Sequence, residues 1–223
     1  MRAIKCIANI LTRNVKTISR SPKQIYPAAT RNAEPILQIL KKTLDGTKSR
    51  LQLLEVSSGT GQHALHFANN FPNITFQPTE FERSLLPSIA AYAEESKYGN
   101  LKEPLYLDIS KPCLENQHGQ FDYILNINML HVSPWSCTEG LFRNSGQLLK
   151  PGGLLIIYGA MAVDGVLEPE SNRQFDKSIR RQNREWGVRD VRDLQKEAAK
   201  YAISLRNMYD MPANNKMLVW AKL

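Results

Sequence analysis

The chain has 223 residues, 42% hydrophobic and 22% charged, with a net charge of +8. This is the composition of a globular protein, and the length suits one domain of ordinary size. No apolar run reaches the roughly 18 residues that predict a membrane span. The three cysteines are far apart, which predicts a reducing compartment and no disulfide framework: Cys6, Cys113 and Cys137.

The positive charge is concentrated at the beginning of the chain. Residues 1–23 hold six of the 29 Lys and Arg residues and no acid, so 23 basic residues face 21 acidic ones in the rest. A body this close to neutral has no electrostatic signature of nucleic-acid binding. We therefore expect no nucleic-acid substrate.

The basic segment has the pattern of an amphipathic helix. Five apolar residues recur at helical spacing with cations mostly between them: Ile4, Ile7, Leu11, Val15 and Ile18. A basic, acid-free, hydroxyl-containing beginning of this kind resembles a mitochondrial transit peptide. A basic arm of a cytoplasmic protein is the alternative. We separate this leader, residues 1–23, from a single domain at residues 24–223.

Strands and helices alternate through most of the domain. A first helix is expected with Pro35 in its first turn and Gly46 at its end. Strands are then predicted over residues 50–56, 73–81, 103–110, 121–130 and 152–161, with helices between them over residues 62–70, 84–96 and 137–149. This alternation predicts a doubly wound, mostly parallel sheet.

The last part of the chain follows a different pattern. A polar insertion leads to a helix within residues 183–202, and residues 203–211 and 215–223 form two apolar segments joined by a short turn. Strands so close in sequence pair antiparallel. The predicted fold class is therefore α/β, with a seven-stranded, mostly parallel sheet that carries an antiparallel C-terminal strand.

The turn after the first strand carries the clearest motif, Glu55-x-x-x-Gly59-x-Gly61. In a doubly wound sheet, ligands bind beyond the carboxyl ends of the strands, and glycines let the backbone approach them. A carboxylate at Glu55 would repel the pyrophosphate of a dinucleotide but favours the ammonium and sulfonium of S-adenosylmethionine. The charge pattern thus favours S-adenosylmethionine as cofactor.

Two other interpretations of this turn stay open. Gly59-x-Gly61-x-x-Ala64 also matches the dinucleotide pattern G-x-G-x-x-G/A, which is typical of nicotinamide-dependent oxidoreductases. The glycines could also do no more than close a tight turn.

Several stretches, taken together and in order, resemble one class of enzyme. They are "YPAATRNAEPIL", "LEVSSGTGQHALHFA", "FQPTEFE", "LDIS", "INMLHVSPW", "LLKPGGLLIIYG", "FDKSIRRQNREWGVRD" and "MPANNKMLVW". The chain is similar to class I S-adenosylmethionine-dependent methyltransferases, which are Rossmann-like, and most similar to the methyltransferase-like twenty-six family. The resemblance covers nearly all of residues 26–223.

The resemblance implies a cofactor site at the ends of the strands. The loop with Glu55, Ser57, Gly59 and Gly61 would wrap the methionine part of the cofactor. Glu80 would bond both ribose hydroxyls, since a carboxylate offers two acceptors to two donors. The remaining implied residues are Asp108 and Ile109 at the adenine, and Asn126, Asn128 and Met129 beneath the transferable methyl.

Some of these positions have alternatives. Ser57 stands where the class I pattern has glycine, so its hydroxyl could bond the cofactor or its side chain could weaken binding. Glu82 could replace Glu80 as the ribose ligand. Asp108 could only cap the following turn, and Asn126 and Asn128 could bond only to backbone.

The chemistry of methyl transfer demands few catalytic groups. Aligning acceptor and methyl supplies most of the rate, and a base is needed only if the acceptor must lose a proton. His131 follows the fourth strand and is the candidate base, with a purely structural histidine as the alternative. His63 and His66 have no further ligand at metal spacing, so we expect packing roles and no metal.

The methyl acceptor is not identified by the sequence. Tyr26, Arg31 and Asn32 precede the expected first helix, where a lid often lies. "NINML" lacks the Asn/Asp-Pro-Pro-Tyr signature of amide and base methylation, and we expect a small molecule over a protein side chain. Arginines of the insertion could bind an anionic acceptor or form a solvated face: Arg180, Arg181, Arg184 and Arg189.

A non-catalytic role is the remaining alternative. A protein of this fold could bind cofactor, or a protein partner, without turnover. Binding residues alone do not distinguish such a protein from an enzyme.

Overall fold

The computed structural model describes residues 23–112 and 119–223. Almost all of the predicted leader, together with Cys6 and Cys113, therefore lies outside the described residues. In the part that is described, no helix is long and apolar enough to cross a membrane.

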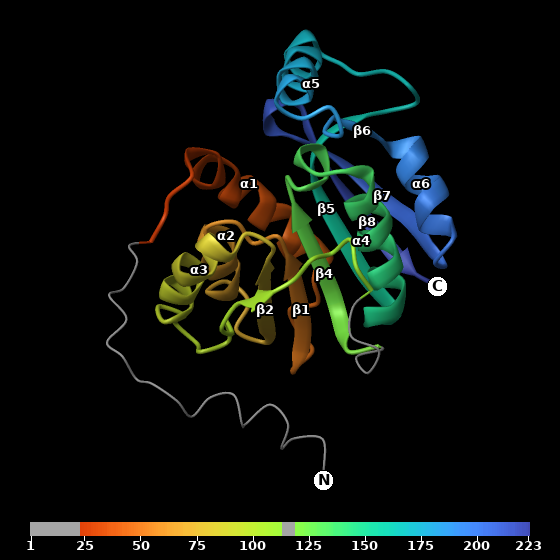
Figure 1. The fold of residues 1–223 in the computed structure, drawn as a ribbon. Coiled ribbons are helices and arrows are strands. Elements are labelled where there is room, and N and C mark those ends of the chain that lie inside the picture. Colours follow the sequence, from red (N-terminus) through yellow and green to blue (C-terminus); the bar gives the residue numbers. More distant parts are fainter. Residues whose placement is uncertain (1–22, 113–118) are drawn as a thin grey trace.

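One mixed sheet forms the centre of the domain (Figure 1). Its strands run in the order β3-β2-β1-β4-β5-β8-β7, and a short β6 pairs with β5 off this path. Every pair is parallel except those of β8, which is antiparallel to β5 and β7. The bounds are β1 (Leu51–Val56), β2 (Ile74–Glu80), β3 (Leu105–Tyr106), β4 (Phe121–Ile127), β5 (Leu149–Ala162), β6 (Arg189–Asp190), β7 (Ile203–Met211) and β8 (Asn215–Lys222). The predicted fold class is confirmed, with β6 as an additional strand.

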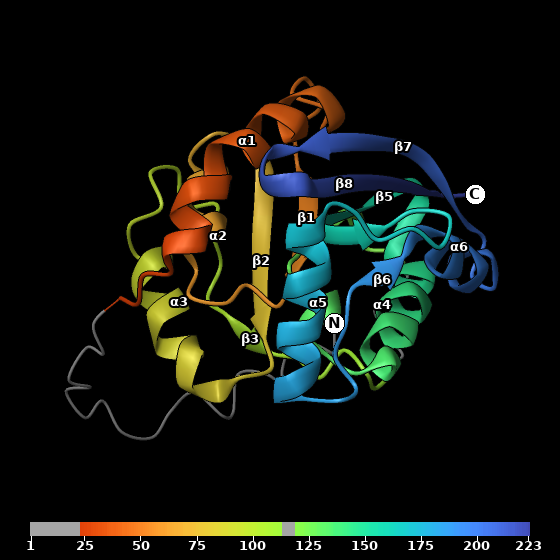
Figure 2. The same ribbon diagram turned by 90° about the horizontal axis from the view of Figure 1, so that it is seen from above.

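Helices cover both faces of the sheet (Figure 2). On one face lie α1 (Pro27–Thr43), α2 (Gln62–Ala68) and α3 (Leu86–Ala93), and on the other lie α4 (Trp135–Leu148) and α6 (Val191–Ala199). A further helix, α5 (Glu170–Gln182), lies over the end of the sheet in the view from above. Three 3-10 turns complete the described elements, at Arg83–Leu85, Leu130–Val132 and Pro212–Asn214.

The buried side chains divide between these two faces. Successive strand residues point to opposite sides, so Leu53 joins the apolar cluster under α1 and α2 while Leu54 joins the cluster under α4 and α6. Trp220 of β8 is fully buried and meets the ring of Phe142 edge-on, with centroids 5.2 Å apart. Strands covered on both faces explain the nearly continuous apolar runs of the sequence.

Three elements differ from the prediction. The first helix begins at Pro27, with Pro35 in its interior, and ends at Thr43, because Pro27 also satisfies the preference for proline in a first turn. The third strand is only two residues long. Helix α5 was not predicted, since of its 13 residues only Asn172 and Ile179 are buried and it has no broad apolar stripe.

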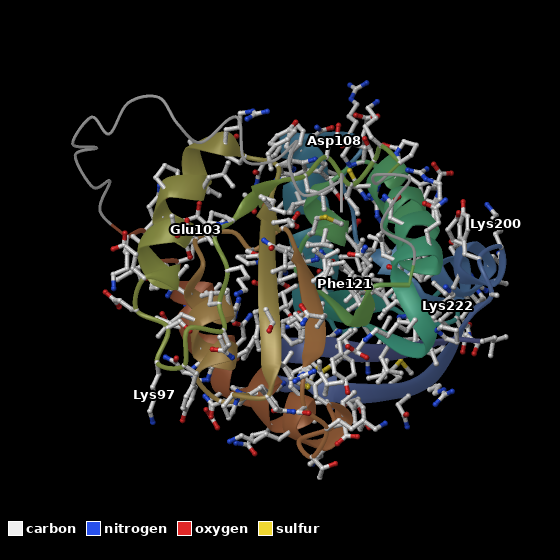
Figure 3. All side chains as sticks on the ribbon, turned by 90° about the horizontal axis from the view of Figure 1, so that it is seen from below. Lys97, Glu103, Asp108, Phe121, Lys200 and Lys222 are labelled. Carbon is white, nitrogen blue, oxygen red and sulfur yellow. The ribbon has the colours of Figure 1, made fainter. Side chains whose placement is uncertain are left out.

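The parallel strands β1, β2 and β4 end at the same edge of the sheet, because Val56 is level with Thr79 and Asn126. Figure 3 shows the opposite edge, where Phe121 begins β4 and Lys222 ends β8. The carboxyl edge is the one that a doubly wound sheet uses for ligands.

Candidate functional site

A cavity of about 1350 Å³ opens at the carboxyl edge of the sheet. The turn after β1, the ends of β2 and β4, and the segment after β3 form part of its wall. The beginning of α1, helix α5, the segment around Trp186 and the turn at residues 212–215 complete the wall. Elements distant in the sequence therefore share one site.

Most residues predicted for the site line this cavity. They are Tyr26, Arg31, Asn32, Glu55, Ser57, Gly59, Glu80, Asp108, Ile109, Asn128, Met129 and His131. Gly61 and Asn126 are not among the lining residues.

Glu80 is held at the end of β2 by three backbone donors. Its Oε2 accepts from the amide of Gly59 at 2.8 Å, and its Oε1 accepts from Phe81 at 2.8 Å and Glu82 at 2.9 Å. The carboxylate is only 7% exposed and lines the cavity. Glu82, the alternative ligand, does not line it and instead accepts from the amide of Ser84 at 3.2 Å. Glu80 is therefore the preorganised acid of the two.

Glu55 carries an unsatisfied buried oxygen. The residue is 2% exposed, and its Oε2 has no hydrogen-bond partner. Burial raises the pKa of Glu55 to about 7; the Ser58 side chain opposes this rise, and repulsion from Glu80 adds to it. A buried carboxylate of this kind calls for a cation or a donor. An ammonium-bearing ligand such as S-adenosylmethionine fits this requirement, whereas a pyrophosphate does not.

The two glycines of the turn have different roles. Both adopt left-handed backbone angles, with φ of +59° at Gly59 and +96° at Gly61. A Cβ on Gly59 would meet nothing within 4 Å, so that backbone faces open space in the cavity. A Cβ on Gly61 would lie 2.9 Å from the Cα of Ile89. Gly61 is thus required for the close approach of α3.

Ser57 and Asn128 are left-handed without being glycine. Both have φ of 59°, one just after β1 and the other just after β4, and both line the cavity. Non-glycine residues in this conformation are strained and gather at functional sites. Glycine adopts this left-handed angle without strain, which explains why the class I pattern has glycine at the position of Ser57.

Asp108 and Ile109 follow β3 and line the cavity. Asp108 Oδ1 accepts from the amide of Ser110 at 3.1 Å and from its hydroxyl at 2.6 Å. The carboxylate thus caps the turn, as the alternative interpretation held, and also faces the cavity. Ile109 is 5% exposed, and its carbonyl accepts from Asn144 Nδ2 at 3.0 Å.

The two asparagines near the end of β4 have different surroundings. Asn126 is fully buried and donates from Nδ2 to the carbonyl of Val56 at 3.0 Å, which ties β4 to β1. Asn128 lies beyond the strand, where its amide donates to the carbonyl of Tyr158 at 2.8 Å and its side chain faces the cavity. A backbone bond is therefore the observed interaction of Asn126.

The histidines of the cavity are neutral at pH 7. Burial, followed by the positive charge of Arg189, lowers the pKa of His131 to about 4. Burial, followed by His66, lowers the pKa of His63 to about 4. His63 Nε2 is 2.7 Å from Asn32 Oδ1. Within residues 23–112 and 119–223, no three His, Cys, Asp or Glu side chains gather closely enough to hold a metal.

Two of the three predicted lid residues lie elsewhere in the fold than expected. Arg31 and Asn32 are inside α1 rather than before it, and Tyr26 is its N-cap residue. The Tyr26 amide donates to Gln62 Oε1 at 2.6 Å. The beginning of α1 is therefore a helical wall fastened to α2.

The arginines of the insertion do not line the cavity. Arg189 donates from Nε to the carbonyl of Leu130 at 3.0 Å and also contacts the Ser133 carbonyl. Arg180 forms an ion pair with Asp176 at 2.8 Å. Within the described residues, Arg189 therefore fastens the insertion to the segment after β4, whereas the Arg180 pair lies within α5.

Several lining residues were missed by sequence reasoning: Phe81, Tyr158, Asn172, Phe175, Trp186 and Asn215. Phe81 could have been identified, because it directly follows Glu80. The others come from β5, from the insertion and from the beginning of β8, and no local pattern brings them to the site.

Comparison with known families gives one match over nearly the whole chain. A family model described as "Protein of unknown function (DUF938)" matches residues 23–222. A highly reducing polyketide synthase, ctvA, of Aspergillus terreus is 28% identical over 125 residues. That match covers 52% of this chain and only 5% of the synthase.

Solved structures share the fold. An O-methyltransferase family protein from Burkholderia thailandensis superposes with a TM-score of 0.73 at 14% identity, over 87% of this chain and 57% of that one. An O-methyltransferase family 2 protein from Planctomyces limnophilus, in complex with apigenin, gives 0.71 at 18% identity, over 88% and 58%. A structure of PigF with SAH gives 0.70 at 17% identity, over 86% and 56%. The chain thus spans a little over half the length of these proteins, and the fold is that of class I methyltransferases.

Proposed function

The chain belongs to the DUF938 family, and from this premise we propose that it is an S-adenosylmethionine-dependent methyltransferase that acts on a small molecule. Within that superfamily, the motifs quoted from the sequence favour the methyltransferase-like twenty-six family. The neighbouring structures support the fold, and the residues of the cavity carry the proposal.

The single observation that carries it is the fixed carboxylate of Glu80. Three backbone amides orient both of its oxygens, and it lines the cavity beside the left-handed Gly59. A carboxylate has about four acceptor sites; three are used by these amides, so one on Oε2 remains free to accept from a ribose hydroxyl. The unsatisfied Oε2 of Glu55 adds a place for an ammonium group.

The roles of the residues follow from their places. Bound S-adenosylmethionine supplies a methyl group on a sulfonium. Glu80 would hold the ribose, Glu55 the ammonium, and Asp108 with Ile109 the adenine, while Ser57, Gly59 and Met129 would shape the remaining wall. Asn128 and His131 face the space next to these residues. His131 is neutral at pH 7 and can accept a hydrogen bond from a hydroxyl of the methyl acceptor, but its lowered pKa makes it a weak base.

Ligand-induced stabilisation tests the proposal. The full chain is unfolded thermally with S-adenosylmethionine, S-adenosylhomocysteine or NAD, and affinities are measured by calorimetry. At about 100 times Kd, a ligand adds roughly 2.7 kcal/mol, which raises the midpoint by about 5–11 °C in a domain of this size. We expect such a rise with the two methionine-derived ligands.

Two matched variants locate the binding. Glu80→Gln keeps the shape of the side chain but loses the charge, so the ligand-induced rise should largely disappear. Glu82→Gln alters the neighbouring acid outside the cavity and should retain it. A rise with NAD alone would favour the oxidoreductase alternative, and no rise with any ligand would favour a protein that acts through a partner without cofactor.

A further inference from the structure

The cavity is larger than one ligand requires. Cavities that bury a single drug-sized ligand measure roughly 300–1,000 Å³, whereas this one measures about 1350 Å³. The acids proposed to hold the cofactor occupy one end of it. The rest of the wall comes from α1, α5, Trp186 and residues 212–215, and we call this part the acceptor end.

Charge is distributed unevenly between the two ends. Among the described lining residues, the acids are Glu55, Glu80 and Asp108, all at the cofactor end. The one arginine that lines the cavity, Arg31, is exposed to solvent. The acceptor end therefore offers no buried charge, and a charged molecule placed there would lose its hydration with only the exposed Arg31 to compensate it.

The acceptor end presents aromatic and amide side chains instead. Phe175 of α5 is 36% exposed and meets the ring of His131 edge-on, with centroids 5.1 Å apart. Trp186 and Tyr158 line the same end, and the Tyr158 hydroxyl interacts with the side chains of Asn32 and Asn215. Tyr158 is only 2% exposed, so Phe175 and Trp186 are the aromatic surfaces that can stack with a planar ring.

The position of α5 is fixed by contacts on several sides. Asn172 donates from Nδ2 to the carbonyl of Asn214 at 3.0 Å, and Asp176 Oδ1 accepts from the amide of Val188 at 2.7 Å. The amide of Gly187 donates to the carbonyl of His131 at 3.0 Å. Phe175 and Trp186 are thus held beside His131 as parts of one wall.

We propose that the acceptor is an uncharged planar aromatic molecule bearing a hydroxyl group, with its ring against Phe175 and its hydroxyl directed at His131. This inference rests on the proposed methyltransferase function. In the transfer, the acceptor oxygen bonds the methyl carbon as the carbon–sulfur bond breaks, the bonding pair goes to sulfur, and the hydroxyl proton, hydrogen-bonded to a nitrogen of His131, is released to water.

Three matched probes test the chemical class. The full chain, with and without saturating S-adenosylhomocysteine, is titrated with 2-naphthol, with its saturated analogue decahydro-2-naphthol, and with its anionic analogue 6-hydroxy-2-naphthoate. Tryptophan fluorescence and calorimetry report binding. We expect 2-naphthol to bind at least tenfold more tightly than either analogue.

Two variants locate the ring. Phe175→Leu removes the aromatic surface but keeps apolar bulk, and should weaken 2-naphthol binding roughly two- to twelvefold while leaving S-adenosylhomocysteine affinity unchanged. Tyr98→Leu removes an exposed aromatic side chain outside the cavity and should change neither.

Each contrary result has a distinct meaning. If the saturated analogue binds as tightly as 2-naphthol, the acceptor need not be aromatic. If the anionic analogue binds more tightly than 2-naphthol, the acceptor need not be uncharged. If S-adenosylhomocysteine binds but no probe does, the acceptor class is wrong and the methyltransferase proposal stands. If S-adenosylhomocysteine fails to bind, the proposed function itself fails.

Discussion

Gly61 should be the glycine of the β1–α2 turn that stability depends on most. Gly61→Ala places a Cβ 2.9 Å from the Cα of Ile89 and 3.1 Å from Cδ2 of Tyr92, at a φ of +96°. The left-handed conformation costs a residue with a Cβ about 1–2 kcal/mol, and overpacking against backbone costs about 1–3 kcal/mol. We expect the free energy of unfolding to fall by roughly 2–5 kcal/mol.

Two further glycines separate these contributions. Gly59→Ala has the same kind of φ and open space around the new Cβ, so it should cost only about 1–2 kcal/mol. Gly46→Ala meets nothing within 4 Å and has no left-handed angle, so it should be neutral or stabilising by up to about 1 kcal/mol. Urea unfolding of the three variants measures the differences. Equal losses at Gly59 and Gly61 would refute the argument from the contact with α3.

Three other predictions concern a titrating group, a buried amide and the leader. The pKa of Glu55 is raised from 4.5 to about 7, so the stability that this group contributes is present below pH 4.5 and is lost as pH rises through 7. In denaturant titrations, the free energy of unfolding of Glu55→Gln should therefore rise relative to that of the wild type by about 3 kcal/mol between pH 4.5 and 7. The depressed pKa values of His63 and His131 act in the opposite direction in both proteins, so they cancel in the comparison. Asn100 is buried and donates from Nδ2 to the carbonyls of Ala68, Phe71 and Ile74 at 3.0, 3.0 and 2.8 Å. Asn100→Leu should lower the free energy of unfolding by about 2–4 kcal/mol, whereas Asn70→Ala, at an exposed position, should lower it by under about 0.5 kcal/mol. Similar losses in the two variants would contradict this reasoning. We also propose that residues 1–23 direct the protein to mitochondria, where mass spectrometry should find a shortened N-terminus; an intact Met1 in that compartment would argue against cleavage.

For the proposed cofactor end of the cavity, the sequence could predict that its residues lie together, because they follow one another closely along the chain. Glu55 and Gly59 belong to a single strand–turn–helix unit, and Glu80 ends the next strand. The carboxyl ends of neighbouring parallel strands lie at the same edge of a sheet, independently of how the rest of the chain packs. Glu80 and Gly59 accordingly meet at 2.8 Å.

The acceptor end could not be predicted in the same way. Phe175 lies on a helix with only two buried side chains, and its position depends on contacts with residues far away in the sequence. Trp186 and Asn215 come from other segments, and no pattern links them to His131. Packing between distant parts of the chain, rather than local preference, brings these residues together.

Motif membership also did not determine the role of each residue. Gly61 belongs to the glycine motif, yet its environment is set by α3 rather than by the cavity. Asn126 ends β4 as predicted, but bonds the neighbouring strand instead of facing the site. Only the three-dimensional surroundings distinguish a ligand contact from a packing contact at such positions.

The place of β8 has a consequence for how the protein is made. β8 is synthesised after all other described elements, yet it lies between β5 and β7 with Trp220 fully buried. The sheet can therefore close only after residues 215–222 have left the ribosome, and Asn215 reaches the acceptor end only in that step. A chain cut short before β8 lacks an interior strand and part of the binding wall at once, so premature termination there removes stability and recognition together.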